Sequence, residues 1–154
     1  MHEKDRKILE MLQENGRISN VDLAKAVELT PSATLERVRK LEEKGFITGY
    51  TARVDPASVG LGLAAFIFVR IDDREDEKRV ARELAAQPWV LELHHLAGED
   101  CFLVKVRAHD TNDLYRILKD EFGRYKAIQT TRTTIVLHTD KETSTLQIGG
   151  DTES

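Results

Sequence analysis

Apolar residues in the first third of the chain recur at helical spacing in three short runs. Ile8, Leu9 and Leu12 fall at i, i+1 and i+4 of the segment DRKILEMLQENG, which predicts a helix that Asn15 and Gly16 close. Two further runs carry their apolar residues on one side: Val21, Leu23, Ala24 and Val27, and then Leu35, Val38 and Leu41. We therefore expect three helices that share a small core.

The ends of the second and third helices are marked by capping residues. Ser19 is a good N-cap, and Asp22 stands three places later as in a shortened capping box. Thr30 caps the next helix, and Pro31 falls at the first helical position, where its fixed φ helps and its missing N–H costs nothing. Gly45 is expected to end this helix.

The connection between these two helices is short. Only Glu28 and Leu29 remain for the turn, so the helices must cross steeply, and the N-terminal half of the second one points outward. A half-alternating strand is predicted at residues 47–54. Two helices, a tight turn and a following strand are typical of a winged helix-turn-helix, which makes double-stranded DNA the first partner to consider.

The remaining chain alternates between strand and helix patterns after an interruption at residues 54–62. A nearly continuous apolar strand begins at Leu61, and a polar helix follows from about Glu75 to Pro88. Two strands, VLELHHLA and CFLVKVRA, are joined by a Gly-Glu-Asp turn. A helix capped by Thr111 and a threonine-rich strand, IQTTRTTIVLHT, complete the order β-α-β-β-α-β.

This order predicts a ferredoxin-like domain, in which both helices pack on one face of a four-stranded antiparallel sheet. The whole chain is then of the α+β class. Its first strand is apolar on both sides, so we expect a second subunit to bury the bare face in a homodimer. A two-fold dimer also suits DNA, because its recognition helices can meet half-sites about one helical turn apart.

These patterns divide the chain into four parts. We expect a winged helix-turn-helix DNA-binding domain at residues 1–54, a linker at 55–62, a ferredoxin-like dimerisation domain at 63–142, which the family resemblance given below makes an effector-binding domain too, and a C-terminal tail at 143–154. The tail is polar, with an edge strand at most around residues 145–148 and disorder beyond it.

Composition and charge refine this interpretation. The chain of 154 residues is 40% apolar and 32% charged, as in ordinary globular proteins, and its net charge of −4 does not favour DNA. Residues 1–60, however, hold ten basic and ten acidic side chains, so the acidity lies outside the DNA-binding domain. No apolar run reaches the roughly 18 residues of a membrane span, and we expect a cytoplasmic protein.

Reactive groups are few. Cys101 is the single cysteine, which excludes an internal disulfide and a cysteine-clustered zinc site. His94 and His95 are neighbours on a strand, so they point to opposite faces and cannot chelate one metal ion together. Because no nucleophile lies beside a base and no glycine-rich phosphate loop occurs, we expect neither an enzyme nor a cofactor.

The exposed side of the third helix supplies the candidate DNA contacts. We expect four of its side chains to reach base edges and two to reach phosphates: Ser32, Thr34, Glu36 and Arg37, and then Arg39 and Lys40. Alternating charges are also typical of a merely solvated helix face. An alternative reading is therefore a ligand-binding or assembly module that does not bind DNA.

Together, these motifs resemble the Lrp/AsnC (feast/famine) transcriptional regulators, and especially the leucine-responsive ones. The resemblance runs from about Asp5 to Glu142 and rests on DRKILEMLQENGRISNVDLA, LERVRKLEEKGFITGYTA, LAGEDCFLVKVRAHD and TTRTTIVLHT in that order. Glu28 departs from the pattern, since the family usually has glycine in the turn between the helices.

The resemblance implies a DNA-binding regulator whose dimers assemble to tetramers or octamers. An amino acid or related metabolite is expected between dimers, and it shifts the arrangement of the recognition helices on DNA. The family's effector site carries over to the hairpin turn and the last strand, at Gly98, Glu99, Asp100, Thr131, Thr133 and Thr134. Carboxylates and hydroxyls of this kind suit an amino-acid zwitterion, and His94 and His95 stand near enough to tune ligand choice.

Overall fold

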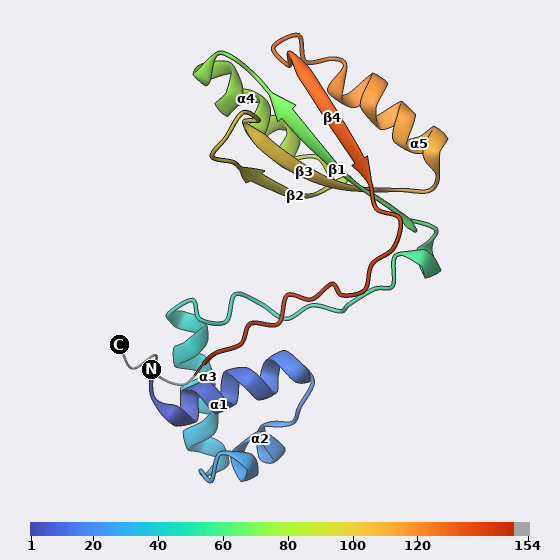
Figure 1. Cartoon of the computed structure of the whole chain (residues 1–154). Helices are drawn as coiled ribbons and strands as arrows, with labels where there is room; N and C mark the ends of the chain where they lie inside the picture. The colour runs from blue at the N-terminus through green and yellow to red at the C-terminus, as the bar shows by residue number, and fades with distance from the viewer. Residues whose placement is uncertain (150–154) are drawn as a thin grey trace. The chain divides into compact units, whose positions relative to one another are not determined.

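A computed structural model describes residues 1–149, and these form two compact units. The N-terminal unit comprises residues 1–53 together with the segment that begins at Lys141, and the second unit comprises Val54–Asp140 (Figure 1). Within residues 1–149, every helix is too short or too polar to cross a bilayer.

Three helices make up most of the N-terminal unit: α1 (Glu3–Glu14), α2 (Asn20–Ala26) and α3 (Pro31–Glu43). The predicted caps are confirmed. Ser19 Oγ accepts the Asp22 N–H at 3.0 Å, and Thr30 Oγ1 accepts the Ala33 N–H at 3.2 Å. Pro31 opens α3, and Gly45 follows its end with a φ of 74°, a conformation that glycine adopts at little cost.

The helices enclose one apolar cluster, whose buried members are Ile8, Leu9, Leu23, Val27 and Leu41. The prediction for Leu35 is wrong, because its side chain is 53% exposed. Thr34 occupies the inward position instead and is fully buried. Thr34, Val38 and Leu41 also stand at helical spacing. The prediction preferred Leu35 to its neighbour Thr34 because leucine is apolar, and spacing alone could not decide between them.

The predicted strand at residues 47–54 does not form. The N–H groups of Phe46 and Ile47 both donate to Leu41 O, at 2.9 and 3.2 Å, and Ile47 packs against the apolar cluster. A strand is stabilised by a ladder to a neighbouring strand, and no strand is assigned anywhere in the described part of this unit. The segment is therefore extended chain that leads out of the unit.

The C-terminal segment returns to the N-terminal unit. The Gln13 side chain accepts the Leu146 N–H at 2.7 Å and donates to Leu146 O at 3.1 Å. Its amide thus forms with Leu146 the two hydrogen bonds that a residue of a neighbouring strand would form. Ile148 packs against the apolar cluster, and Arg53 Nη2 donates to Glu142 O at 3.2 Å. The sequence allowed an edge strand at most, and residues 145–148 form none, because they are anchored without a ladder; residues 150–154 of the expected tail lie outside the described part.

The second unit has the predicted order of strands and helices. It contains a single 3₁₀ turn, η1 (Ala57–Val59), and then β1 (Leu63–Arg70), α4 (Arg74–Ala85), β2 (Val90–His95), β3 (Phe102–Ala108), α5 (Thr111–Arg116), the π-helical turn η2 (Ile117–Phe122) and β4 (Thr130–Ile135). The strands lie in the order β2-β3-β1-β4, and every neighbouring pair is antiparallel. This is the ferredoxin-like sheet that the pattern predicts.

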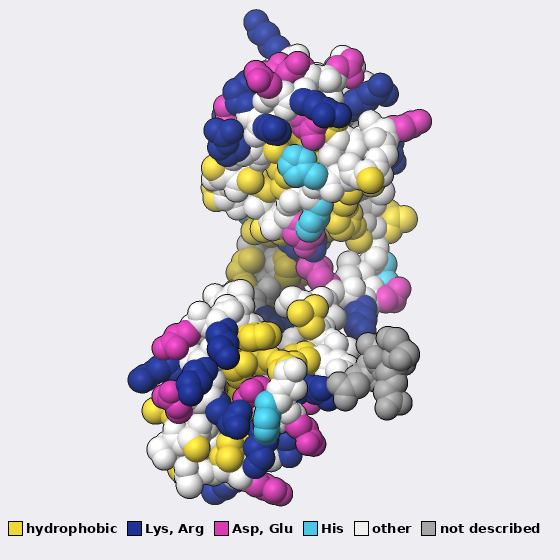
Figure 2. All heavy atoms as spheres, turned by 90° about the vertical axis from the view of Figure 1, so that its left-hand side faces the viewer, with side chains coloured by type: hydrophobic (Ala, Val, Ile, Leu, Met, Phe, Trp, Pro, Cys, Tyr) yellow, Lys and Arg dark blue, Asp and Glu magenta, His cyan; other side chains and the backbone are white. Residues whose placement is uncertain are grey.

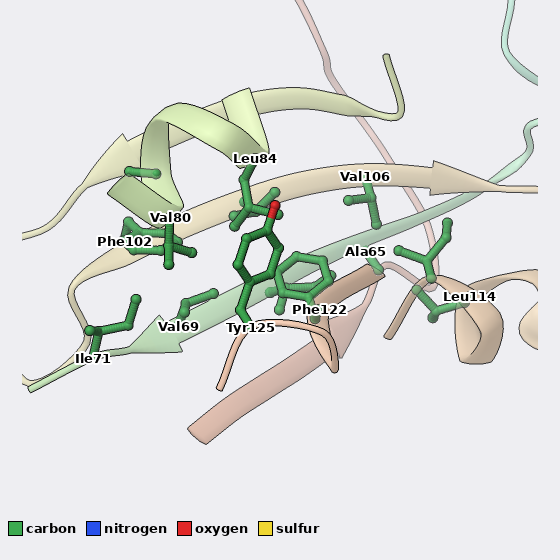
Figure 3. Close-up of a cluster of buried hydrophobic side chains, with 14 of the residues drawn as sticks. Ala65, Val69, Ile71, Val80, Leu84, Phe102, Val106, Leu114, Phe122 and Tyr125 are labelled. Atoms are coloured by element: carbon green, nitrogen blue, oxygen red, sulfur yellow. The ribbon is translucent and has the colours of Figure 1, made fainter. Parts of the chain in front are cut away.

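Both helices cover the same sheet face. Ala65, Ile67 and Val69 of β1 are fully buried there, as alternation along a strand requires. Figure 3 shows Val80 and Leu84 of α4 above these strands, with further buried side chains from the α5–η2 region, which include Leu114, Phe122 and Tyr125. The cap of the second helix is Asp110 rather than the predicted Thr111, because Asp110 Oδ1 accepts the Asp113 N–H at 2.8 Å.

Candidate DNA-binding and effector sites

Helix α3 presents a polar face to solvent. Its exposed side chains recur every three or four residues and include four of the six expected DNA contacts, Ser32, Glu36, Arg39 and Lys40. Glu36 and Lys40 form an i, i+4 ion pair at 3.5 Å, with side chains 53% and 59% exposed. Such a pair contributes only a few tenths of a kcal/mol, so both groups are available to a partner.

The other two expected contacts, Thr34 and Arg37, lie away from this exposed face. Thr34 is fully buried, and its hydroxyl donates to Thr30 O at 3.0 Å, so it is not placed to reach a base edge. Arg37 Nη1 donates to Asp5 Oδ1 of α1 at 2.7 Å, with side chains 32% and 22% exposed. Arg37 therefore points toward α1 and holds two helices together.

The turn between α2 and α3 contains the one non-glycine residue with positive φ in the described part of the chain. Glu28 has a φ of 55°, in the left-handed region that favours glycine. Lys4 Nζ donates to Glu28 O at 3.0 Å, which fixes this turn against the start of α1. The departure noted in the sequence thus falls on a strained backbone position, and the turn keeps its tight form with glutamate there.

Charged side chains of both signs are interleaved on the N-terminal unit, which is the lower body in Figure 2, and several lysines and arginines lie close together on the face shown there. The equal number of basic and acidic residues in this part of the sequence is thus spread over the surface. On the exposed side of α3, Arg39 and Lys40 lie among the carboxylates of Glu36, Glu42 and Glu43. These two cations are the groups on this side that suit a phosphate backbone.

In the second unit, the hairpin turn and the last strand meet through an arginine. The turn at residues 97–100 is closed by Leu96 N–H donating to Cys101 O at 2.9 Å. Asp100 Oδ2 accepts from Arg132 Nη2 at 3.0 Å, and the guanidinium of Arg132 lies 4.1 Å from the ring centre of Phe68. The carboxylate of Asp100 in this turn therefore lies beside a cation. The family resemblance had not indicated this arginine.

The three threonines of the expected effector site do not share one face. Thr134 pairs with Phe66 and Arg132 pairs with Phe68, on the sheet face away from the helices. Thr131 and Thr133 pair with Val69 and Ile67 and so lie on the helix-covered face. Alternation along the TTRTT segment would have grouped Arg132 with Thr134, so this arginine was recognisable from the sequence.

The open sheet face is less bare than its apolar pattern implies. Phe66 and Phe68 are half-buried. Lys105 Nζ lies 5.9 Å from the Phe66 ring centre and 3.4 Å from Glu92 Oε1, and Lys105 is only 8% exposed. Long cationic side chains thus cover both rings within one chain, which leaves a mixed polar and aromatic face.

The hairpin site is open to solvent, and a separate cavity lies elsewhere in the unit. This cavity of about 350 Å³ contains none of the six expected effector residues and is lined by Leu61, Pro88, Trp89, Leu91, Arg107, Asp113, Arg116, Ile117 and Glu121. Nearer the hairpin, His94 Nε2 and His95 Nδ1 each lie 3.2 Å from a carboxylate oxygen, of Glu92 and Glu77 respectively. Among residues 1–149, no three His, Cys, Asp or Glu side chains are grouped as metal ligands.

A helix-turn-helix unit joined to a ferredoxin-like unit with a charged hairpin site defines a DNA-binding regulator with a ligand-binding domain. Comparison with known families agrees. A family model described as winged helix-turn-helix DNA-binding matches residues 1–48, and one described as Lrp/AsnC ligand binding domain matches residues 64–146. The chain belongs to the Lrp/AsnC family of transcriptional regulators.

Similar proteins align over nearly the whole chain. The HTH-type transcriptional regulator FL11 of Pyrococcus horikoshii is 35% identical, over 96% of this chain and 97% of its own. The leucine-responsive regulatory protein of Escherichia coli K12 is 36% identical, over 94% of this chain and 89% of its own. A crystal structure of a Neisseria meningitidis transcriptional regulator in complex with L-Met is 35% identical, covers 96% of both chains and superposes with a TM-score of 0.91.

Proposed function

We propose that this regulator reads its operator with the outward face of α3 and that Ser32 and Glu36 contact base edges while Arg39 and Lys40 contact phosphates. The observation that carries this proposal is the sidedness of α3. Thr34 and Leu41 face the core and Arg37 faces α1, so the opposite side alone is free for a duplex. Glutamate accepts from cytosine N4, and exposed cations lower the charge of the backbone.

The ligand of the second unit is proposed to be an amino acid at the hairpin. The carboxylates of Glu99 and Asp100 suit an ammonium group and Arg132 suits a carboxylate, so a zwitterion finds both partners close together in space. Gly98 and the threonines of β4 complete the proposed site, with Thr134 beside Arg132 and with Thr131 and Thr133 on the other side of the strand. The similar regulator solved with L-Met supports this class of ligand.

Assembly beyond the single chain is part of the proposal. The hairpin site is open, and the face with Phe66 and Phe68 is broad and aromatic, so both are suited to cover by another copy. We propose a homodimer through this face and association of dimers to a tetramer or octamer around the ligand. Such a regulator acts on DNA in the cytoplasm and needs no catalytic step.

The ligand proposal is tested by thermal melting with a panel of amino acids. A ligand that binds the folded protein raises the melting midpoint by mass action. The Arg132→Ala variant should lose this shift, whereas Arg79→Ala, which removes an exposed ion pair to Asp76 on α4, should keep it. A shift of equal size in both variants would place the ligand elsewhere, with the cavity near Trp89 as the next candidate.

The DNA proposal is tested by titrating operator DNA at several salt concentrations. Each phosphate contact contributes about 0.9 to the slope of log affinity against log salt, so Arg39→Ala and Lys40→Ala should each reduce the slope by about one. Thr34 and Arg37 are not expected to change it. A chain that only assembles, without binding DNA, would show no steep slope.

A further inference from the structure

Leu35 is an exposed leucine at one edge of the proposed DNA-reading face of α3. Its side chain is 53% exposed, and it lies one turn after Ser32 and one turn before Arg39. The other exposed positions of α3 beyond Pro31 carry polar or charged side chains, so Leu35 is the single large apolar group on this side of the helix.

One exposed leucine alone is ordinary, but its place here is chemically specific. Leucine has no polar atom in its side chain, so in a major groove it gains free energy only by covering apolar surface. Among base edges in that groove, the thymine 5-methyl group offers such surface. We propose that Leu35 reads a thymine through its methyl group and so sets part of the operator sequence.

The neighbouring side chains favour DNA over a protein as the occupant of this face. Arg39 follows Leu35 by one turn on the same side of α3, and a protein interface would desolvate this cation, whereas a duplex supplies a phosphate to it. Leu35 would then lie deep in the groove while Arg39 holds the backbone. This inference rests on the proposed DNA-binding function and adds a contact to that same face.

The expected effect is that of one buried methyl group. Burial of one such group corresponds to about 0.8 kcal/mol, or about fourfold in affinity. Replacement of thymine by uracil removes only this methyl group and leaves the hydrogen-bonding edges unchanged. Uracil substitution therefore isolates the contact that Leu35 would make.

The experiment uses the full-length protein and an operator selected from random DNA. Each thymine within the footprint is replaced by uracil in turn, and affinity is measured by gel shift. The wild type should lose about fourfold at one thymine position in each half-site. Leu35→Ala should bind more weakly overall and show no loss at that position, whereas Leu35→Met, which keeps a long apolar side chain, should retain most of it.

A matched control comes from the second unit. Leu137 is 98% exposed and belongs to none of the proposed sites, so Leu137→Ala removes the same atoms from an exposed position and should leave the uracil profile unchanged. Melting curves confirm that each variant is folded, and alanine is the best helix former at an exposed helical position.

The outcomes separate this inference from the function on which it rests. If no operator is selected and the wild type binds all DNA alike, the proposed function fails. If the wild type binds an operator but no uracil lowers affinity, or if Leu35→Ala keeps the same sensitive position, the function stands and the role of Leu35 is overturned.

Discussion

The guanidinium of Arg37 on α3 donates to the carboxylate of Asp5 on α1 at 2.7 Å. Both side chains are largely shielded, so the pair joins the recognition helix to the helix behind it. Arg37 therefore holds α3 against α1, although its position in the sequence suggests a direct contact with DNA. The distinction is testable, because a structural pair depends equally on both partners.

Replacement of either partner should destabilise the N-terminal unit. We expect Arg37→Ala and Asp5→Ala each to lower the free energy of unfolding by about 1 kcal/mol, a value reduced for partial exposure. The double variant should lose less than the sum of the two. Chemical denaturation measures all three. If Asp5→Ala were as stable as the wild type while Arg37→Ala lost operator binding, Arg37 would be a DNA contact after all.

The turn at Glu28 predicts a stabilising substitution. A φ of 55° is unfavourable for a residue with a Cβ atom, and glycine relieves that strain at some cost in unfolded-state entropy. Glu28→Gly should therefore raise the free energy of unfolding by about 0.5–1 kcal/mol. Glu28→Ala, which keeps a Cβ atom, is the matched control and should not be stabilised. A destabilised glycine variant would show that the glutamate side chain supports the turn.

The C-terminal segment should contribute to the stability of the N-terminal unit. Ile148 is half-buried against its apolar cluster, so Ile148→Ala should lower the free energy of unfolding by about 1 kcal/mol. Gln13→Ala removes both hydrogen bonds to Leu146 and should have a similar effect. Leu146→Ala is the control, since that side chain is 72% exposed. Equal melting midpoints for all three would show that this anchoring does not stabilise the unit.

Asp113 predicts a pH dependence of stability in the second unit. Donation from the His109 N–H, and then from the Arg116 guanidinium, holds the pKa of this carboxyl below its ordinary value of 3.8. The folded state therefore binds the proton less tightly than the unfolded state, and the stabilisation is complete above that ordinary value and is lost as the pH falls through the folded pKa.

Melting midpoints measured from about pH 6 down to about pH 2 check this dependence. Asp113→Asn should be less stable near neutral pH and should lose less stability on acidification than the wild type. Asp140→Asn, at a carboxylate that is 96% exposed, is the control and should follow the wild-type curve. Parallel curves for Asp113→Asn and the wild type would contradict the role given to this carboxylate.

The sequence predicted those features that depend on local chemistry. Ser19, Thr30 and Gly45 mark the ends of helices because capping and left-handed backbone are decided within a few residues. The order of strands and helices in the second unit was predicted for the same reason. Because β1 is apolar on both sides, its alternation did not show which side the helices cover, and the structure places Ala65, Ile67 and Val69 there.

Features that depend on distant partners were not predicted. The strand expected at residues 47–54 lacks a neighbour to pair with, and the anchoring of Ile148 requires a helix more than a hundred residues away. Leu35 was expected to be buried and Thr34 to be exposed, and the structure shows the reverse. Either residue fits the helical spacing of α3, and the packing of α1 decides which one is buried. Alternation along β4 could have indicated Arg132 itself, but not its hydrogen bond to Asp100, which lies in the turn between β2 and β3.

Because the segment that starts at Lys141 belongs with residues 1–53, the chain crosses between its units twice, and the N-terminal unit is discontinuous in sequence. A gene fragment that stops at the linker would encode a recognition module without one piece of its own interior. Exchange of the ligand-binding module between relatives would accordingly need two matched junctions, one before Val54 and one after Asp140, so that the closing segment stays with the helices it fits.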